Sequence, residues 1–295
     1  HTFFDEVQKS CLTRGVRITG SELVGLIPLK AMLDAGKHFL KKQGRSLGVS
    51  EEELIHIAVK SMGLDELGPF DPNKKIIEYQ LKNESDEHLI NLTAKNLAQE
   101  TASESMAPGG GSISAYVGTL GVSLGTMVAN LSANKSGWEE KVDIFSSWAE
   151  KGQAIQKELL FLVDEDTRSF NDIIDAIRMP KDTPNENAIR LDAIEKASKY
   201  AAEVPFKVME TAYKAYELLK AMQEIGNPAS ITDAGVGALC CMTAIEGAYM
   251  NVRINTKDLK DKPFAENLNK KSHDLLVRAK KNLETIVQHV HTSIQ

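Results

Sequence analysis

The pattern of apolar and polar positions along the chain changes near residue 83. Before that point, apolar residues alternate with polar ones over residues 16–25 (VRITGSELVG), and residues 74–81 (KKIIEYQL) have a similar character, so we predict two short strands. Helices are predicted over Pro28–Lys42 and over Ser50–Met62, the second opened by the N-cap pattern Ser-x-x-Glu. This first part is therefore expected to be a partial α+β segment, too small to form a complete domain.

Residues 83–295 follow the longer period of α-helices and contain no convincing strand pattern. Proline and glycine mark the expected helix ends, for example at Pro180 and in the Gly-Asn-Pro run at residues 226–228. We expect helices over about Ser85–Glu104, Gly111–Asn134, Gly137–Ile177, Glu186–Ile225 with a kink at Pro205, Thr232–Val252 and Pro263–Ile294. The predicted fold class is mainly α, with one multihelical domain at residues 83–295 after a segment at residues 1–82.

Two of these helices consist largely of small and apolar residues. Residues 105–134 contain no charged side chain, which is long enough to be tested as a transmembrane span. The run is rich in Gly, Ser and Thr rather than Leu, and no aromatic belt or basic flank frames it. We therefore predict a buried helix and no membrane span. The run Ala234–Val252 has the same character, so the two helices are expected to pack against each other or across a subunit interface.

Composition narrows the classes of partner. The net charge is −6, aromatic residues make up 6% of the chain, and no block of Lys or Arg stands out, so a nucleic-acid partner is not expected. The three cysteines form no even-numbered disulfide framework, which favours a reducing, cytoplasmic location. The chain begins at His1 without a methionine and without the apolar run of a signal peptide, so we interpret it as a fragment or a processed product.

The candidate for chemistry is Asp166. In the helix predicted from Gly137, an apolar stripe includes Val163 and Phe170, and Asp166 takes the position that continues it between them. A carboxylate that points inward either finds a partner or has its pKa raised, which is how a general acid or base for neutral pH is made. A structural carboxylate bonded to a helix end or a hydroxyl group is the alternative. Asp164, by contrast, is expected to form an ordinary helical ion pair with Arg168.

Three glycines and a serine, Gly109, Gly110, Gly111 and Ser112, stand directly before a predicted helix. Glycines allow close approach of a ligand to the backbone, and the free N–H groups of a helix start suit an anion or a carbonyl oxygen. A simple tight turn is the alternative, and the run matches neither common phosphate-binding motif.

Polar residues elsewhere leave alternatives open. Ser230 and Asp233 are of the types that cap helices. Asn251 and Asn255 lie one helical turn apart, where their amides either bind the edge of a polar heterocycle or tie two helices together. The seven histidines are scattered without metal-ligand spacing, so no metal is expected.

Four segments occur in the order seen in formimidoyltetrahydrofolate cyclodeaminases, and the chain resembles that family over about 150 residues. They are ESMAPGGGSISAYVGTLGVSLGTMVANLS, LVDEDTRSFNDIIDAIRMPK, GNPASITDAGVGAL and GAYMNVRIN. Residues 13–79 also resemble the end of the formiminotransferase half of the two-domain formiminotransferase-cyclodeaminases of histidine catabolism, through VRITGSELVGLIPLKAMLDAG and GLDELGPFDPNKKIIEY.

The resemblance implies an ammonia lyase that converts 5-formiminotetrahydrofolate into 5,10-methenyltetrahydrofolate and ammonia, with a helical domain that forms an intertwined dimer or a higher oligomer. The family's catalytic aspartate falls on Asp166. The expected substrate contacts are Gly109, Gly110, Gly111, Ser112, Asp164, Lys181, Ser230, Asp233, Asn251, Arg253 and Asn255. Lys181 or Arg253 would meet the acidic folate tail, and a polyglutamylated folate is among the substrates that the resemblance allows.

No cofactor is expected beyond the tetrahydrofolate substrate itself. The part of the transferase that carries its catalytic histidine is absent from this sequence, so transferase activity is not expected from this chain alone, and the rest of that portion is an expected partner. A methenyltetrahydrofolate cyclohydrolase of the same helical family is one alternative. A nonenzymatic helical scaffold that only binds folate is the other, although an inward carboxylate argues against it.

Overall fold

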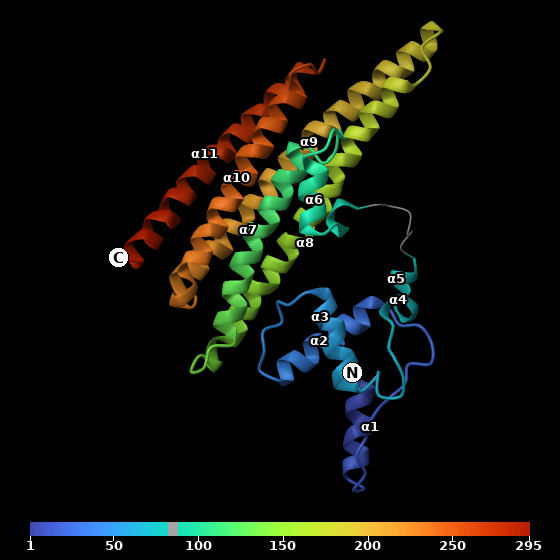
Figure 1. The fold of residues 1–295 in the computed structure, drawn as a ribbon, viewed down its shortest axis with the longest axis vertical. Helices are drawn as coiled ribbons and strands as arrows, with labels where there is room; N and C mark the ends of the chain where they lie inside the picture. Colours follow the sequence, from blue (N-terminus) through green and yellow to red (C-terminus); the bar gives the residue numbers. More distant parts are fainter. Residues whose placement is uncertain (82–87) are drawn as a thin grey trace. The chain divides into compact units, whose positions relative to one another are not determined.

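A computed structural model describes residues 1–81 and 88–295 of the chain, which form two compact units (Figure 1). The first unit contains residues 1–81 together with residues 132–150, and the second contains residues 88–131 and 151–295. The predicted domain boundary at residues 82–83 and the predicted helix start at Ser85 lie outside the described residues. Each unit has its own core and is described by itself.

The first unit is built around two packed helices. Its helices are α1 (Thr2–Leu12), α2 (Leu29–Lys42), α3 (Glu51–Met62), α4 (Pro72–Lys75) and α5 (Ile77–Gln80). The predicted N-cap of α3 is confirmed, because the Ser50 side chain accepts a hydrogen bond from the amide of Glu53. Helix α2 approaches α3 at Gly36, where a Cβ atom would lie 2.8 Å from the carbonyl carbon of Leu54. Only glycine allows the two helices to pack this closely.

The strands predicted in this part of the chain are wrong. Residues 16–25 have no regular secondary structure, and residues 74–81 lie mainly in α4 and α5. The described residues contain no strand, and their one β-bridge joins Ile27 to Ile76. A strand needs a neighbouring backbone to satisfy its N–H and C=O groups over several residues, and a single bridge supplies this for one residue pair only. The alternating pattern is therefore not sufficient for a strand here.

The second unit contains the long helices, and the mainly α fold class is confirmed. Its elements are η1 (Leu89–Asn91), α6 (Ala94–Thr101), α7 (Gly110–Ala133), α8 (Val142–Arg178), α9 (Pro184–Ile225), η3 (Pro228–Ser230), α10 (Ile231–Thr256) and α11 (Lys262–Ser293). The C-terminal end of α7 and the start of α8 belong to the first unit. The helix predicted over residues 85–104 is shorter than expected, since only η1 and α6 form there. Helix α9 continues through Pro205, and Figure 1 shows α9, α10 and α11 alongside one another.

The two helices rich in small residues pack against each other, as predicted. A Cβ atom on Gly121 of α7 would lie 2.8 Å from the carbonyl oxygen of Gly237 in α10, and one on Gly118 would lie 3.1 Å from the Cβ of Ala244. Both helices are long and apolar enough to cross a membrane by length and composition, and 61% and 50% of their most apolar windows are buried inside the protein. Close backbone approach between α7 and α10 thus accounts for their small residues.

Candidate active site

The carboxylate of Asp166 points from α8 toward the first turn of α7. Its Oδ2 atom accepts one hydrogen bond from the Ser112 amide, at 2.7 Å, and a second from the Ser112 hydroxyl, at 2.9 Å. Burial raises the pKa of Asp166, and the two hydrogen bonds from Ser112 only partly oppose this effect because they favour the charged form. The inward direction predicted from helix phase is therefore confirmed, and the partners of the carboxylate are neutral.

The three glycines Gly109, Gly110 and Gly111, called the glycine run below, lie next to this carboxylate. A Cβ atom on Gly111 would lie 2.5 Å from the Cγ of Asp166, whereas one on Gly109 would meet nothing within 4 Å. Residue 111 therefore has to be glycine while Asp166 keeps this position, and residue 109 does not. The Ser112 amide is one of the N–H groups that a helix start leaves without an intrahelical partner, and Asp166 satisfies it from a different helix.

Asn251 and Asn255 differ in their surroundings. The sequence left open whether each binds a polar heterocycle or ties two helices together. Asn251 lies beside the glycine run, because a Cβ atom on Gly110 would lie 3.5 Å from its Nδ2 atom, and that amide donates to the carbonyl of Gly247 at 2.9 Å. Asn255 donates to the carbonyl of Ala201 at 2.7 Å and so ties α10 to α9. The structure therefore places Asn251 at the candidate site and gives Asn255 a structural contact.

Several predicted contacts are not brought to Asp166 within one chain. Ser230 and Asp233 lie at the start of α10, and the 18 residues from Asp233 to Asn251 span about 27 Å of helix. Lys181 is exposed in the loop after α8, and Arg253 is exposed on α10. Ser230 and Asp233 therefore do not form one site with the glycine run in a single subunit.

The predicted ion pair between Asp164 and Arg168 is wrong. Asp164 instead accepts a hydrogen bond from the amide of Leu89 at 2.7 Å and lies 3.1 Å from Nδ1 of His88. Arg168 pairs with Glu165, three residues before it. Spacing along a helix admits both pairings, and the segment before α6 decides between them because it supplies a backbone donor to Asp164.

Glu165 is a second buried carboxylate on α8, which the sequence did not single out. It is 3% exposed and accepts a hydrogen bond from the hydroxyl of Tyr200 in α9. The apolar stripe offered a sign of it, because the position three residues after the buried Leu162 is Glu165 and the position four residues after it is Asp166. Helix periodicity is therefore consistent with an inward direction for both carboxylates.

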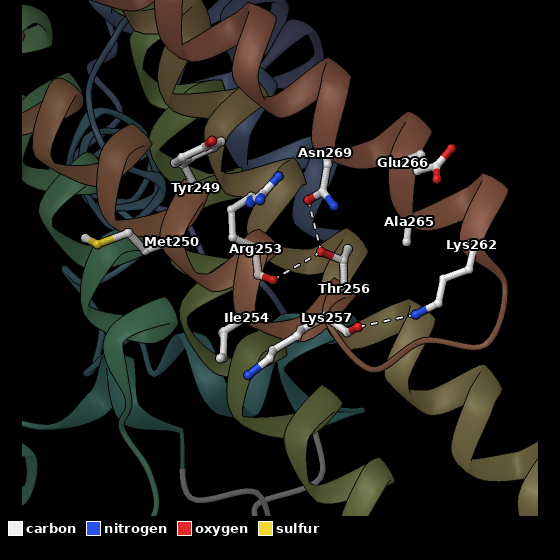
Figure 2. Close-up of a pocket in the computed structure, with 10 residues that line it drawn as sticks. All are labelled: Tyr249, Met250, Arg253, Ile254, Thr256, Lys257, Lys262, Ala265, Glu266 and Asn269. Carbon is white, nitrogen blue, oxygen red and sulfur yellow. Dashed lines mark hydrogen bonds between the residues drawn. The ribbon is translucent and has the colours of Figure 1, made fainter.

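A groove of about 530 Å³ lies between α10 and α11, as Figure 2 shows. Arg253, Lys257 and Lys262 line it, and its floor includes a hydrogen bond from the Thr256 hydroxyl to Oδ1 of Asn269 at 2.9 Å. Arg253 points into this groove, toward α11. Asn251 is two residues earlier on α10, which turns it to a different side of the helix. One face of α10 thus lines the groove, and a different face lies beside the glycine run.

In the first unit, His1, Asp5 and His38 bring ligand-type atoms within 4.8 Å of one another. The two imidazole rings stack, with centroids 4.0 Å apart and planes 9° from parallel, and Lys42 Nζ lies 3.6 Å from Asp5 Oδ1. Histidine binds a metal through a lone pair in the ring plane, so two parallel rings do not converge on one ion. We interpret this group as an ionic cluster, and the expectation that the protein needs no metal stays a prediction.

Comparison with known proteins shows similarity along nearly the whole chain. Residues 93–274 match the family model described as formiminotransferase-cyclodeaminase, and residues 1–82 match that of the formiminotransferase domain. The formimidoyltransferase-cyclodeaminase of Mus musculus is 34% identical over 281 residues, which cover 95% of this chain and 52% of the mouse protein. The chain thus spans about half the length of such relatives.

Two further comparisons concern the helical part. The methenyltetrahydrofolate cyclohydrolase of Methylorubrum extorquens is 31% identical over 204 residues, covering 69% of this chain and 98% of that protein. The crystal structure of formiminotetrahydrofolate cyclodeaminase from Thermotoga maritima superimposes with a TM-score of 0.58 at 24% identity, over 70% of this chain and 97% of that structure. The second similarity shows that the two helical folds are alike.

Proposed function

The chain belongs to the formiminotransferase-cyclodeaminase family, and from that premise we propose that its second unit converts 5-formiminotetrahydrofolate into 5,10-methenyltetrahydrofolate and ammonia, with Asp166 as the proton carrier. The observation that carries the proposal is the Asp166 carboxylate, whose hydrogen-bond donors among the described residues are the two neutral groups of Ser112 at the start of α7.

The proposed reaction needs one proton to move between two nitrogens of the substrate. N10 attacks the amidine carbon carried on N5, which forms the new C–N bond and gives a tetrahedral aminal. The substrate reacts as its amidinium, whose terminal nitrogen already carries two hydrogens. The C–N bond to this amino group then breaks, and the proton from N10 ends on the departing nitrogen, so that ammonia leaves and the methenyl ring keeps the positive charge. A carboxylate that accepts the first proton and donates it to the second position serves both steps.

Burial suits Asp166 to this task. An ordinary aspartate is almost fully ionised near neutral pH and is a poor proton donor, whereas burial raises the pKa of Asp166 and brings its protonated form within reach. Both hydrogen bonds from Ser112 go to Oδ2, which leaves Oδ1, beside Gly111, as the oxygen that exchanges the proton. Ring closure is already intramolecular, so the protein has mainly to hold N10 near the amidine carbon.

The remaining contacts follow from the positions of the polar groups near Asp166. Gly109 and Gly110 precede Ser112 at the helix start and offer backbone atoms to the pterin ring or to the bridging atoms. Asn251, which lies beside Gly110, offers the carbonyl oxygen of its side-chain amide. Lys181, exposed after α8, and Arg253, exposed in the groove between α10 and α11, are the candidates for the acidic tail of the folate.

The second candidate is a methenyltetrahydrofolate cyclohydrolase, which opens the same product ring with water. The observation in its favour is that a relative with this name matches the helical part of the chain over 98% of its own length. The two reactions share the methenyl ring and need the same kind of proton carrier. Substrates therefore have to distinguish them.

One assay does so by following the methenyl chromophore with two substrates. With 5-formiminotetrahydrofolate, a cyclodeaminase increases methenyl absorbance and releases one ammonia per ring formed. With 5,10-methenyltetrahydrofolate, a cyclohydrolase decreases the absorbance faster than the uncatalysed hydrolysis. We expect methenyl formation with ammonia release from 5-formiminotetrahydrofolate. With 5,10-methenyltetrahydrofolate we expect the absorbance to fall only at the uncatalysed rate. If the protein instead decreases the absorbance of 5,10-methenyltetrahydrofolate and releases no ammonia from 5-formiminotetrahydrofolate, the cyclohydrolase is favoured.

We further propose that the active protein is a homodimer or a higher oligomer. Val236, Leu239, Met250 and Ile254 lie along one face of α10, and each is at least 49% exposed. An exposed apolar face of this extent is typical of a subunit interface. Sedimentation at micromolar concentration tests this: a dimer or larger species is expected, and a monomer at all concentrations would contradict it.

A further inference from the structure

We propose that Glu165 is a positioning residue, which holds α8 against α9 at the one rotation about the helix axis that turns Asp166 toward Gly111 and Ser112. The catalytic consequence of this inference rests on the function proposed above, but the structural part does not.

The burial of Glu165 requires an explanation. Among the buried residues of the described chain it is the only one with a charged side chain, at 3% exposure. Removing a charge from water is costly unless the group is paired and fully hydrogen-bonded. Both oxygens of Glu165 are used: Oε1 accepts from the hydroxyl of Tyr200, and Oε2 pairs with the guanidinium of Arg168. The contact to Tyr200 joins α8 to α9.

Neighbouring residues of an α-helix point about 100° apart, because there are about 3.6 residues in each turn. When Glu165 is held toward Tyr200, the direction of Asp166 is therefore fixed as well. A group near the outer radius of a helix, about 5 Å from the axis, moves by about 1 Å when the helix rotates by about 10°. Displacements of about 1 Å at a catalytic group can cost about a hundredfold in rate.

The surroundings of Asp166 leave little room for such a rotation. Its Oδ2 is 2.7 Å from the Ser112 amide, and its carboxylate lies over Gly111 so closely that a Cβ there would be 2.5 Å from Cγ. A rotation in one direction lengthens the hydrogen bonds, and a rotation in the other presses the carboxylate against the backbone. The structure therefore needs an anchor close to Asp166, and Glu165 is its neighbour in the chain.

The alternative is that Glu165 acts through its charge. The pKa of Asp166 is raised by burial and lowered by the two hydrogen bonds from Ser112. Arg168 lies against the carboxylate of Glu165 and offsets its charge. The inference therefore predicts that the hydrogen-bond acceptor matters and the charge does not. Glu165→Gln keeps an oxygen for Tyr200, Glu165→Ala removes it, and Tyr200→Phe removes only the hydroxyl.

The position of Asp166 can be followed without an activity assay. The chain contains two Gly-Ser pairs, Gly20-Ser21 and Gly111-Ser112, so labelling Gly carbonyls with ¹³C and Ser amides with ¹⁵N gives two linked amide signals. The Ser112 amide reports on its hydrogen bond to Asp166. The Ser21 amide, which donates to the carbonyl of Gly63 in the first unit, is the internal reference.

We expect the Ser112 signal to shift in Tyr200→Phe and Glu165→Ala, to stay near its parent position in Glu165→Gln, and the Ser21 signal to stay unchanged in all three. In the same proteins kcat should fall about tenfold or more in the first two variants, with KM within about twofold, because substrate contacts are kept while the proton carrier is displaced. Should Glu165→Ala not fold, Tyr200→Phe carries the test because it lacks one hydroxyl group only.

A Ser112 signal that stays unchanged in folded Tyr200→Phe overturns the inference. Equal losses in Glu165→Gln and Glu165→Ala also overturn it, because they would show that the charge is what matters. The proposed function fails in a different way: the parent protein then turns over neither folate, while the Ser112 signal still shifts in Tyr200→Phe.

Discussion

Two regions of the second unit each bring a carboxylate to the start of a helix, and they differ in what else the carboxylate meets. At the start of α11, Asp261 accepts a hydrogen bond from the amide of Phe264 at 3.0 Å and another from Lys199 at 2.6 Å. The contact with Lys199 lowers the pKa of Asp261. At the start of α7, Asp166 also accepts from a backbone amide, but its other donor is a hydroxyl group, and burial raises its pKa.

A helix start does not by itself decide whether a nearby carboxylate caps the helix or carries a proton. Both aspartates satisfy a free N–H group of the first turn. The one with a cation and access to water stays ionised and acts as a cap, whereas the one with neutral donors and little water can hold a proton. The candidate active site is thus defined by the absence of a cation among the described contacts of Asp166, as well as by the carboxylate.

The largest effect is expected for a substitution that prevents the close approach of Asp166 to the start of α7. Gly111→Ala adds a Cβ that would lie 2.5 Å from Cγ of Asp166, so either the carboxylate or the helix start has to move. We expect a loss of kcat of about a hundredfold or more, measured by methenyl formation. Gly25→Ala in the first unit is the control, since its Cβ would meet nothing within 4 Å. Equal activities of the two alanine variants would contradict the assigned geometry.

A smaller effect is expected when one of the two neutral donors is removed. Ser112→Ala keeps the amide bond to Asp166 and loses the hydroxyl bond. Because that bond favours the charged form, its loss should raise the pKa of Asp166 further, and the limb of the pH–rate profile that belongs to Asp166 should move to higher pH. We expect kcat to fall about tenfold. A shift of this limb to lower pH would be inconsistent with the proposed hydrogen bond.

The smallest effect concerns stability, and it has opposite signs in the two regions. The pKa of Asp166 is raised above the ordinary value of 3.8, so its carboxyl contributes stability that is present below 3.8 and lost as pH rises through the folded pKa. Asp166→Asn should therefore melt above the parent at neutral pH, and this gain should vanish in acid. The pKa of Asp261 is lowered, so its contribution is present above 3.8 and lost as pH falls through the folded pKa.

Asp261→Asn should consequently melt below the parent at neutral pH and approach it in acid. Thermal unfolding of both variants at a series of pH values measures the two trends side by side. The same sign of change in both variants would show that the two carboxylates do not differ in the way described here.

The features that the sequence predicted are those set by neighbours along the chain. Helix phase placed Asp166 inward, Ser50 was found as the cap of α3, and the small residues of α7 and α10 indicated close packing. Each of these follows from local periodicity or from residue size. The phase argument was nevertheless incomplete, because it admits Glu165 as well as Asp166.

The features that the sequence did not predict depend on partners far away in the chain. Asp164 lies by spacing within reach of Arg168 and is instead bound by the amide of Leu89, 75 residues earlier. Glu165 is buried because Tyr200 comes from the next helix, 35 residues later. Asn255 is structural because Ala201 presents a carbonyl group to it. Sequence spacing contains no record of such contacts, so these roles required the fold.

In the proposed mechanism the Asp166 carboxyl carries the proton during ring closure. Single-turnover formation of the methenyl ring from 5-formiminotetrahydrofolate tests it most directly, with Asp166→Asn compared with Asp172→Asn, an exposed aspartate six residues further along α8. The account predicts a rate lower by about a hundredfold or more for Asp166→Asn and an unchanged rate for Asp172→Asn. Equal rates for the parent and Asp166→Asn would contradict it.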